Sequence, residues 1–159
     1  MKKRALGITL GFLAGFLISM VIFKSGMSYE ARIDSTWEIK IPLERKLMFK
    51  TISLKDEEMK DGYYPEYRVY ESEKGQKKEE LRQILVTKQR YNEEKNPEME
   101  KEFNKLLDED RIQEDMRPDF SEDYIWFKAD PSLKSHLTAY AVYQEDSDRF
   151  YIIETRKLK

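Results

Sequence analysis

The longest uncharged stretch of the chain, residues 5–23, constrains the fold more than any other feature. Its nineteen residues (ALGITLGFLAGFLISMVIF) follow three basic residues, Lys2, Lys3 and Arg4, and precede Lys24. A helix of this length is about 28 Å long at ~1.5 Å per residue, close to the ~30 Å hydrocarbon core of a bilayer. We therefore predict a single transmembrane helix over residues 5–23 that stays in the membrane as a signal anchor.

The basic residues around this run predict its orientation. Residues 2–4 are all basic, whereas the basic residues after the run are spaced apart and mixed with acidic ones. Lys and Arg close to a span favour the cytoplasmic side, and acidic residues contribute little. We expect a cytoplasmic N-terminus at residues 1–4, a juxtamembrane linker at residues 24–35 and an extracytoplasmic domain at residues 36–159. The protein would then lie in the cell membrane.

The alternative is a secretory signal peptide, which would release a secreted protein if residues 1–26 were cleaved. Cleavage needs small side chains at the site, and the apolar region of a signal peptide usually has about 7–15 residues. A cut after Gly26 would place Lys24 where a small residue is needed, and a cut after Ala31 would place Tyr29 there. The sequence therefore favours the retained anchor, and the secreted form stays as the alternative.

Small residues recur within the run at every fourth position, namely Gly7, Gly11, Gly15 and Ser19. This spacing places them on one face of a helix, where small side chains let two helices approach closely in lipid. Glycine is also simply common in transmembrane segments. The pattern predicts membrane helix packing, either self-association or contact with another membrane protein.

The composition of residues 25–159 excludes several classes of function. They contain 25 basic and 31 acidic residues, a formal net charge of −6, with the two signs interspersed. Nucleic-acid binders need a concentrated basic surface, so we expect no nucleic-acid partner. The chain has no cysteine and one histidine, which excludes disulfides and zinc–thiolate sites. We predict no cofactor and no metal site.

Periodicity predicts an α+β domain with a mainly antiparallel sheet and a helical insert. Strands are predicted at residues 36–43, 47–54, 64–72, 124–129, 137–144 and 149–157, and the last two form a hairpin with a four-residue loop. Residues 76–116 are rich in helix-forming residues. Asn96 and Pro97 predict the start of a second helix in this insert, with Met99, Phe103, Leu106 and Leu107 on its apolar face. Because strands and helices are segregated, we expect the helices to cover one face of the sheet.

No catalytic or metal motif is convincing. His136, beside Ser135, is the only histidine, and the chain lacks the G-x-S-x-G motif that positions a nucleophilic serine. Asp108 and Asp110 resemble the start of a calcium loop, but Gln113 stands where that loop needs glycine. Pairs of carboxylates that hydrolyse glycosides cannot be recognised by spacing in so acidic a chain. A carboxylate-dependent hydrolase acting on cell-envelope polymer therefore stays as an alternative.

A tyrosine-rich segment is the remaining candidate for ligand contact. It contains Tyr63, Tyr64, Tyr67 and Tyr70, and aromatic residues are enriched at binding surfaces. Tyr67 and Tyr70 point to opposite faces of a strand, so at most some of these rings can share a surface. We name Tyr64, Tyr67 and Tyr70 as possible ligand contacts. The overall expectation is a single-pass membrane protein with a non-enzymatic extracytoplasmic binding or accessory domain.

Overall fold

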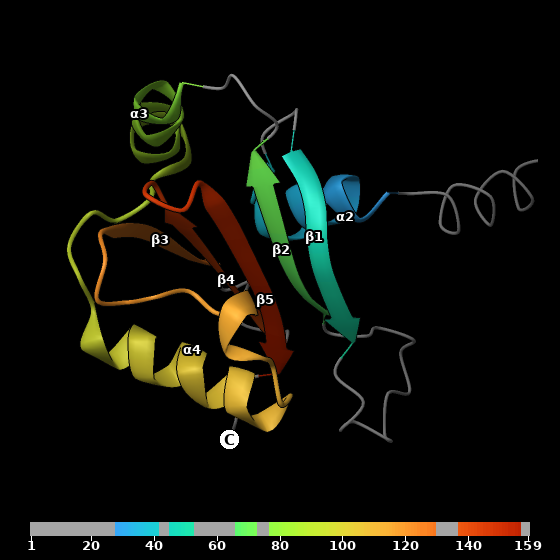
Figure 1. The fold of residues 1–159 in the computed structure, drawn as a ribbon. Helices are drawn as coiled ribbons and strands as arrows, with labels where there is room; N and C mark the ends of the chain where they lie inside the picture. The colour runs from blue at the N-terminus through green and yellow to red at the C-terminus, as the bar shows by residue number, and fades with distance from the viewer. Residues whose placement is uncertain (1–27, 42–44, 53–65, 73–76, 130–136, 157–159) are drawn as a thin grey trace, which may run out of the picture.

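The computed structural model describes residues 28–41, 45–52, 66–72, 77–129 and 137–156, and within them the chain has an α+β fold (Figure 1). The helices are α2 (Tyr29–Trp37), α3 (Lys78–Gln89), α4 (Pro97–Glu109) and the 3-10 helix η1 (Glu114–Met116), and the strands are β1 (Arg45–Ile52), β2 (Glu66–Ser72), β3 (Tyr124–Ala129), β4 (Leu137–Gln144) and β5 (Arg149–Arg156). The predicted fold class is thereby confirmed.

The five strands form one antiparallel sheet in the order β1-β2-β5-β4-β3. Strands β4 and β5 are joined by the predicted four-residue turn at residues 145–148. This hairpin lies at the centre of the sheet, with β2 beside β5 and β3 beside β4. The order leaves β1 and β3 as the two edge strands.

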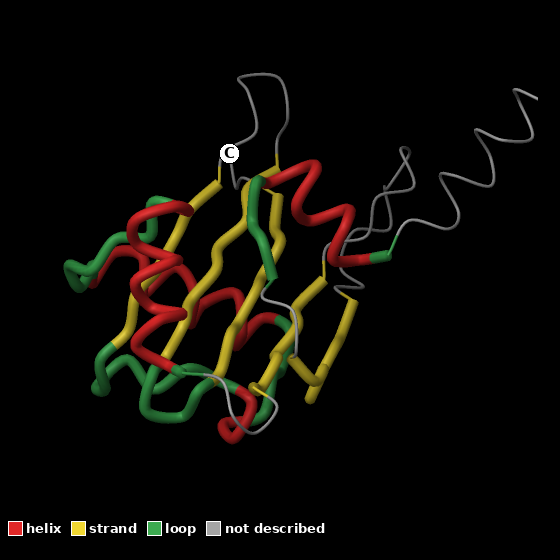
Figure 2. The backbone as a smooth tube through the Cα atoms, turned by 90° about the horizontal axis from the view of Figure 1, so that it is seen from above, coloured by secondary structure: helices red, strands yellow, loops and turns green. Residues whose placement is uncertain are grey.

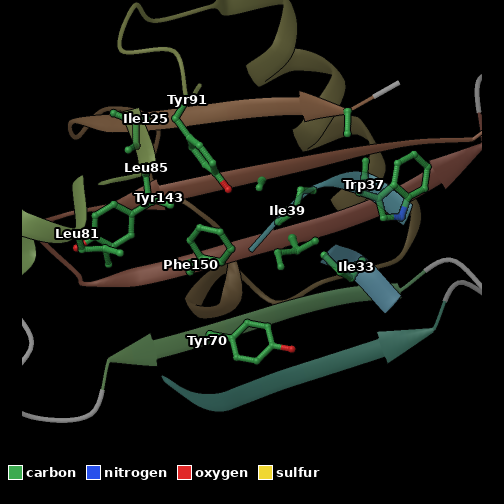
Figure 3. Close-up of a cluster of buried hydrophobic side chains, with 14 of the residues drawn as sticks. Ile33, Trp37, Ile39, Tyr70, Leu81, Leu85, Tyr91, Ile125, Tyr143 and Phe150 are labelled. Atoms are coloured by element: carbon green, nitrogen blue, oxygen red, sulfur yellow. The ribbon is translucent and has the colours of Figure 1, made fainter. Parts of the chain in front are cut away.

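The helices cover both faces of the sheet, so the expectation of one covered face is wrong (Figure 2). Helices α2 and α3 share a core with one face, shown in Figure 3, and α4 shares a second core with the other face. Successive side chains of strand β5 point alternately into the two cores. Phe150 and Ile152 face α2 and α3, whereas Tyr151 and Ile153 face α4. The central strands are apolar on both sides for this reason.

Helix α4 begins where the sequence predicts. The Asn96 side chain accepts hydrogen bonds from the backbone N–H groups of Glu98 (3.1 Å) and Met99 (3.0 Å), and Pro97 occupies the first helical position. These contacts satisfy N–H groups that a helix start leaves unpaired. The predicted apolar face is also confirmed, because Met99, Phe103, Leu106 and Leu107 are all buried.

The strand predicted over residues 36–43 is wrong. Residues 29–37 form α2, which begins inside the stretch predicted as a linker, and residues 38–41 belong to no strand. Ser28 caps the helix by accepting a hydrogen bond from the backbone N–H of Ala31. Tyr29, Ile33 and Trp37 follow at four-residue spacing and bury one helical face. This spacing outweighs the two-residue alternation that starts at Trp37.

The predicted anchor at residues 5–23 lies outside the described residues, and so do its small residues Gly7, Gly11, Gly15 and Ser19. Within the described ranges, no helix has the length and apolar character needed to cross a membrane.

Candidate functional site

The two edges of the sheet differ in how they are closed. The outer edge of β3 pairs with the segment between α3 and α4, where Asn92 and Trp126 exchange two backbone hydrogen bonds of 2.7 and 3.0 Å. The Trp126 indole N–H also donates to the carbonyl oxygen of Glu94 (2.9 Å). No residue in the described ranges pairs with the outer edge of β1. An edge strand of this kind presents unpaired N–H and C=O groups.

Strand β1 also exposes apolar side chains. Leu47, Met48 and Ile52 are 39%, 36% and 41% exposed. The pairing with β2 shifts between Leu47 and Phe49, which leaves Met48 in a bulge. Phe49 is half-buried against the Tyr67 ring, with 6.1 Å between the ring centroids. β1 is therefore attached to the domain on its inner side and accessible on its outer side.

Arg45 fixes the start of β1 to the β4–β5 turn. Its guanidinium binds the Asp148 carboxylate (2.9 Å) and donates to the Asp148 carbonyl oxygen (2.9 Å). It also lies over the Tyr143 ring, 5.2 Å from the centroid, and its side chain is fully buried. Burial and the neighbouring Asp148 raise the pKa of Tyr143. The positive charge of Arg45 is thus paired with Asp148 inside the domain.

The other two basic residues of β1 remain at the surface. Lys46 and Lys50 are exposed, and neither forms an ion pair with another described residue. The strand has no acidic residue. The outer edge of β1 is therefore locally basic, although residues 25–159 carry a formal net charge of −6.

Helix α2 is held to the sheet by three residues, the half-buried Arg32 and the buried Trp37 and Glu154, which we call the α2 clasp. The Glu154 side chain is fully buried in β5. It accepts two guanidinium hydrogen bonds from Arg32, each 2.9 Å, and one from the Trp37 indole N–H, 2.8 Å. A buried carboxylate is stable only when it has an ion-pair partner and enough hydrogen-bond donors, and here the guanidinium and the indole N–H provide both.

The α2 clasp continues into β2. Arg32 lies 3.5 Å from the Glu66 carboxylate, and Glu66 binds Arg68 at 2.7 Å. The Arg68 guanidinium stacks on the Tyr29 ring, 3.5 Å from its centroid, and Arg32 lies 4.9 Å from the same centroid. Burial raises the pKa of Tyr29, and the nearby Glu154 acts in the same direction. The first two turns of α2 are thus fixed to two adjacent strands.

Two surface grooves have mixed charge. One, of about 570 Å³, lies where α2 and α3 end, and its lining includes the acidic Asp34 and Glu38 and the basic Lys88 and Arg90. The other, of about 590 Å³, lies beside α4 and is lined by residues including Asp108, Arg117 and Asp119. In the lining of this second groove, Arg117 forms an ion pair with Asp108. Neither groove has the single-sign lining that would select a charged ligand.

Two described carboxyl groups, Glu30 and Asp119, have a lowered pKa, which does not suit a general acid. A general acid needs a raised pKa. Partial burial acts to raise the pKa of Glu30, but hydrogen bonds from its own backbone N–H, Tyr70 and Ser28 lower it overall. Hydrogen bonds from Ser121 lower the pKa of Asp119. No cluster of three metal-ligating side chains occurs among the residues that the structure describes.

Two of the predicted ligand-contact residues, Tyr67 and Tyr70, do not share one surface. Tyr67 is buried in the core under α4, and its hydroxyl donates to the carbonyl oxygen of Met116. Tyr70 is buried in the opposite core (Figure 3). Its hydroxyl donates a hydrogen bond to the Glu30 carboxylate (3.0 Å). Tyr67 is 1% exposed and Tyr70 is 2% exposed. Tyr64 and the histidine His136 lie outside the described residues. Ligand contact by these residues stays untested.

Sequence reasoning missed the α2 clasp and the edge position of β1. The position of Glu154 could have indicated a buried charge. It interrupts the apolar run of β5, and the two-residue period of a strand places it on the same face as Phe150 and Ile152. A lone charge in a buried strand needs a partner. The partner Arg32 is 122 residues away in the sequence, so no local pattern indicates it. The edge position of β1 depends on strand order, which spacing does not determine.

Comparisons of the chain with protein-family models, with curated proteins and with solved structures find no match. The features of the chain that bear most on its function are therefore the edge strand β1 and the attachment of α2 to the sheet.

Proposed function

We propose that the chain is a single-pass membrane protein whose extracytoplasmic α+β domain works by binding a partner at the outer edge of β1. The observation that carries the binding part is the contrast between the two sheet edges. The chain pairs the β3 edge at Trp126 with its own backbone, whereas no described residue pairs with the outer edge of β1, where Leu47, Met48 and Ile52 are exposed. Exposed apolar side chains on an accessible edge are typical of interaction sites.

The position of α2 supports the membrane tether. Residues 5–23 form the uncharged run, and only residues 24–28 separate it from the start of α2 at Tyr29. The α2 clasp attaches this helix to β5 and, through Glu66, to β2. A domain joined to its anchor by five residues would stay close to the membrane surface. The N-terminus would lie in the cytoplasm, as the basic residues before the run favour.

The anchor would also contribute a contact of its own. Gly7, Gly11, Gly15 and Ser19 provide a small-residue face on which a second copy or another membrane protein packs. Replacing Gly11 and Gly15 by Leu should reduce self-association in a membrane reporter assay. Unchanged association would refute self-pairing through this face.

Binding at β1 is tested with a photo-crosslinking amino acid placed at Met48 in the full chain, in its native membranes. The expected result is a discrete crosslinked product from this position. The matched control carries the same amino acid at Lys101, which is exposed on α4. Equal products from both positions, or none from Met48, would refute the proposed surface.

The tether is tested separately by fractionation and by protease treatment of intact cells. The domain should stay with the membrane fraction and should be degraded without lysis. A free species that begins near Met27, or a domain protected until lysis, would contradict the proposed topology.

A further inference from the structure

We infer that the outer edge of β1 binds an extended acidic segment of a partner protein by strand addition. This inference rests on the proposed binding role of β1 and adds the chemistry of the partner. It follows from three properties of the strand, namely an outer edge with which no described residue pairs, the positions of its lysines and its exposed apolar side chains.

The backbone favours an extended partner. β1 has eight residues, and its inner side pairs with β2 from Arg45 to Ile52. In an antiparallel ladder, alternate residues direct their N–H and C=O groups to the opposite edge. An incoming strand can therefore form a second ladder with groups that no described residue uses. A helix or a folded surface could not satisfy this row of donors and acceptors.

The lysines favour an acidic partner. Lys46 lies opposite Glu71, and Lys50 lies opposite Arg68. Residues opposite each other share a face of the sheet. Arg68 stacks on Tyr29 of α2, so Lys50 is on the α2 face. Glu71 follows Tyr70 and lies on the α4 face with Lys46. An acidic side chain on either face of an added strand would meet a lysine.

The apolar side chains add a second requirement. Leu47 lies opposite Tyr70, and Ile52 lies opposite Glu66, so both are on the α2 face with Lys50. An added strand would cover them best with apolar residues on that face. The partner segment is therefore acidic and partly apolar, rather than purely charged.

The same lysines disfavour a second copy of the chain. Symmetric pairing of two β1 edges would place Lys46 and Lys50 of both copies along one short pair of strands, with lysines on both faces. Repulsion between like charges disfavours such a pair, and lysines on edge strands commonly prevent self-pairing. Charge complementarity thus selects a different, acidic strand.

The inference is tested with a random library of displayed ten-residue peptides, selected against the purified full chain in detergent. The test variant is K46E/K50E. The matched control is K101E/K105E, which makes the same charge change at two exposed positions of α4. The best recovered peptide is then synthesised with and without N-methyl groups at alternate residues, which remove N–H donors without changing charge.

We expect the recovered peptides to be enriched in Asp and Glu over Lys and Arg. The synthesised peptide should bind the K46E/K50E variant at least tenfold more weakly, and K101E/K105E within twofold of the original chain. N-methylation should also weaken binding at least tenfold. No enrichment of acidic residues, equal loss in both variants, or binding that tolerates N-methylation would overturn the inference.

A Met48 crosslink combined with any of these results would leave the binding role of β1 intact and refute only the partner chemistry. Concentration-dependent self-association that K46E/K50E changes would identify a second copy as the occupant instead.

Discussion

Replacing Arg32 by Met should destabilise the domain strongly, because the substitution leaves the Glu154 carboxylate buried without its guanidinium partner. Glu154 has a fully buried side chain, whereas that of Arg32 is 26% exposed. The indole N–H of Trp37 would remain as a donor, but two hydrogen bonds of 2.9 Å would be lost. Methionine keeps most of the apolar stem of arginine, so lost packing contributes little.

The expected loss is about 3–5 kcal/mol in the free energy of unfolding, the usual result of removing one partner of a buried ion pair. This corresponds to a fall of roughly 10–20 °C in melting temperature for a domain of this size. The loss reflects the uncompensated buried charge, not the net value of the ion pair. Replacing both partners, in R32M/E154L, should therefore recover most of the stability.

The assay is urea unfolding of the full chain in mild detergent, followed by tryptophan fluorescence. Arg82→Met is the matched control, because Arg82 is 28% exposed and pairs with Glu93 at 3.3 Å and Glu145 at 3.7 Å on the surface. A surface pair of this kind contributes about 0–1 kcal/mol. If R32M lost no more stability than R82M, or if R32M/E154L were less stable than R32M, the argument from buried charge would be refuted.

Three further predictions concern the core, a helix start and the tyrosines. Leu85→Ala should cost about 2–5 kcal/mol in urea unfolding because Leu85 is fully buried, whereas Ile84→Ala, at a position 42% exposed, should cost less than about 1 kcal/mol. Asn96→Ala removes the cap of α4 and should cost about 1 kcal/mol in the same assay. Burial and the contact with Glu100 raise the pKa of Tyr124 to about 12. The folded chain therefore holds this phenolic proton more tightly than the unfolded chain, and stability should fall as the pH rises from about 10 to 12. The part of the absorbance change at 295 nm that a Tyr124→Phe variant lacks should appear above pH 10, and its appearance near pH 10 in the folded chain would contradict this.

Local patterns predicted the elements whose structure depends on near neighbours. Strands β3 and β4 have the predicted bounds, because turns or charged residues interrupt apolar runs there. α4 begins at Pro97 because the capping side chain and the first helical residue are adjacent in the sequence. The opposite orientations of Tyr67 and Tyr70 follow from the two-residue period of a strand and are confirmed.

Features that depend on distant contacts were not predictable in the same way. Residues 36–43 alternate like a strand, but Tyr29, Ile33 and Trp37 bury a helical face against a sheet formed much later in the chain. The presence of a helix on each face follows from the two-sided apolar character of β5 only once β5 is known to be central. The α2 clasp and the open edge of β1, which carry the functional proposals, depend on strand order and on pairs far apart in sequence.

The α2 clasp and the β1 edge are connected through β2, which leads to a last prediction. Glu66 contacts Arg32 of the clasp, and Arg68 stacks on Tyr29 of α2. On β1, Glu66 lies opposite Ile52, and Arg68 lies opposite Lys50. Loosening α2 should therefore affect β1 and β2 more than β3 and β4. Under conditions where R32M is still folded, amide hydrogen exchange should accelerate most in residues 45–52 and 66–72. An equal acceleration in residues 124–129 would indicate uniform destabilisation and would refute a connection through β2.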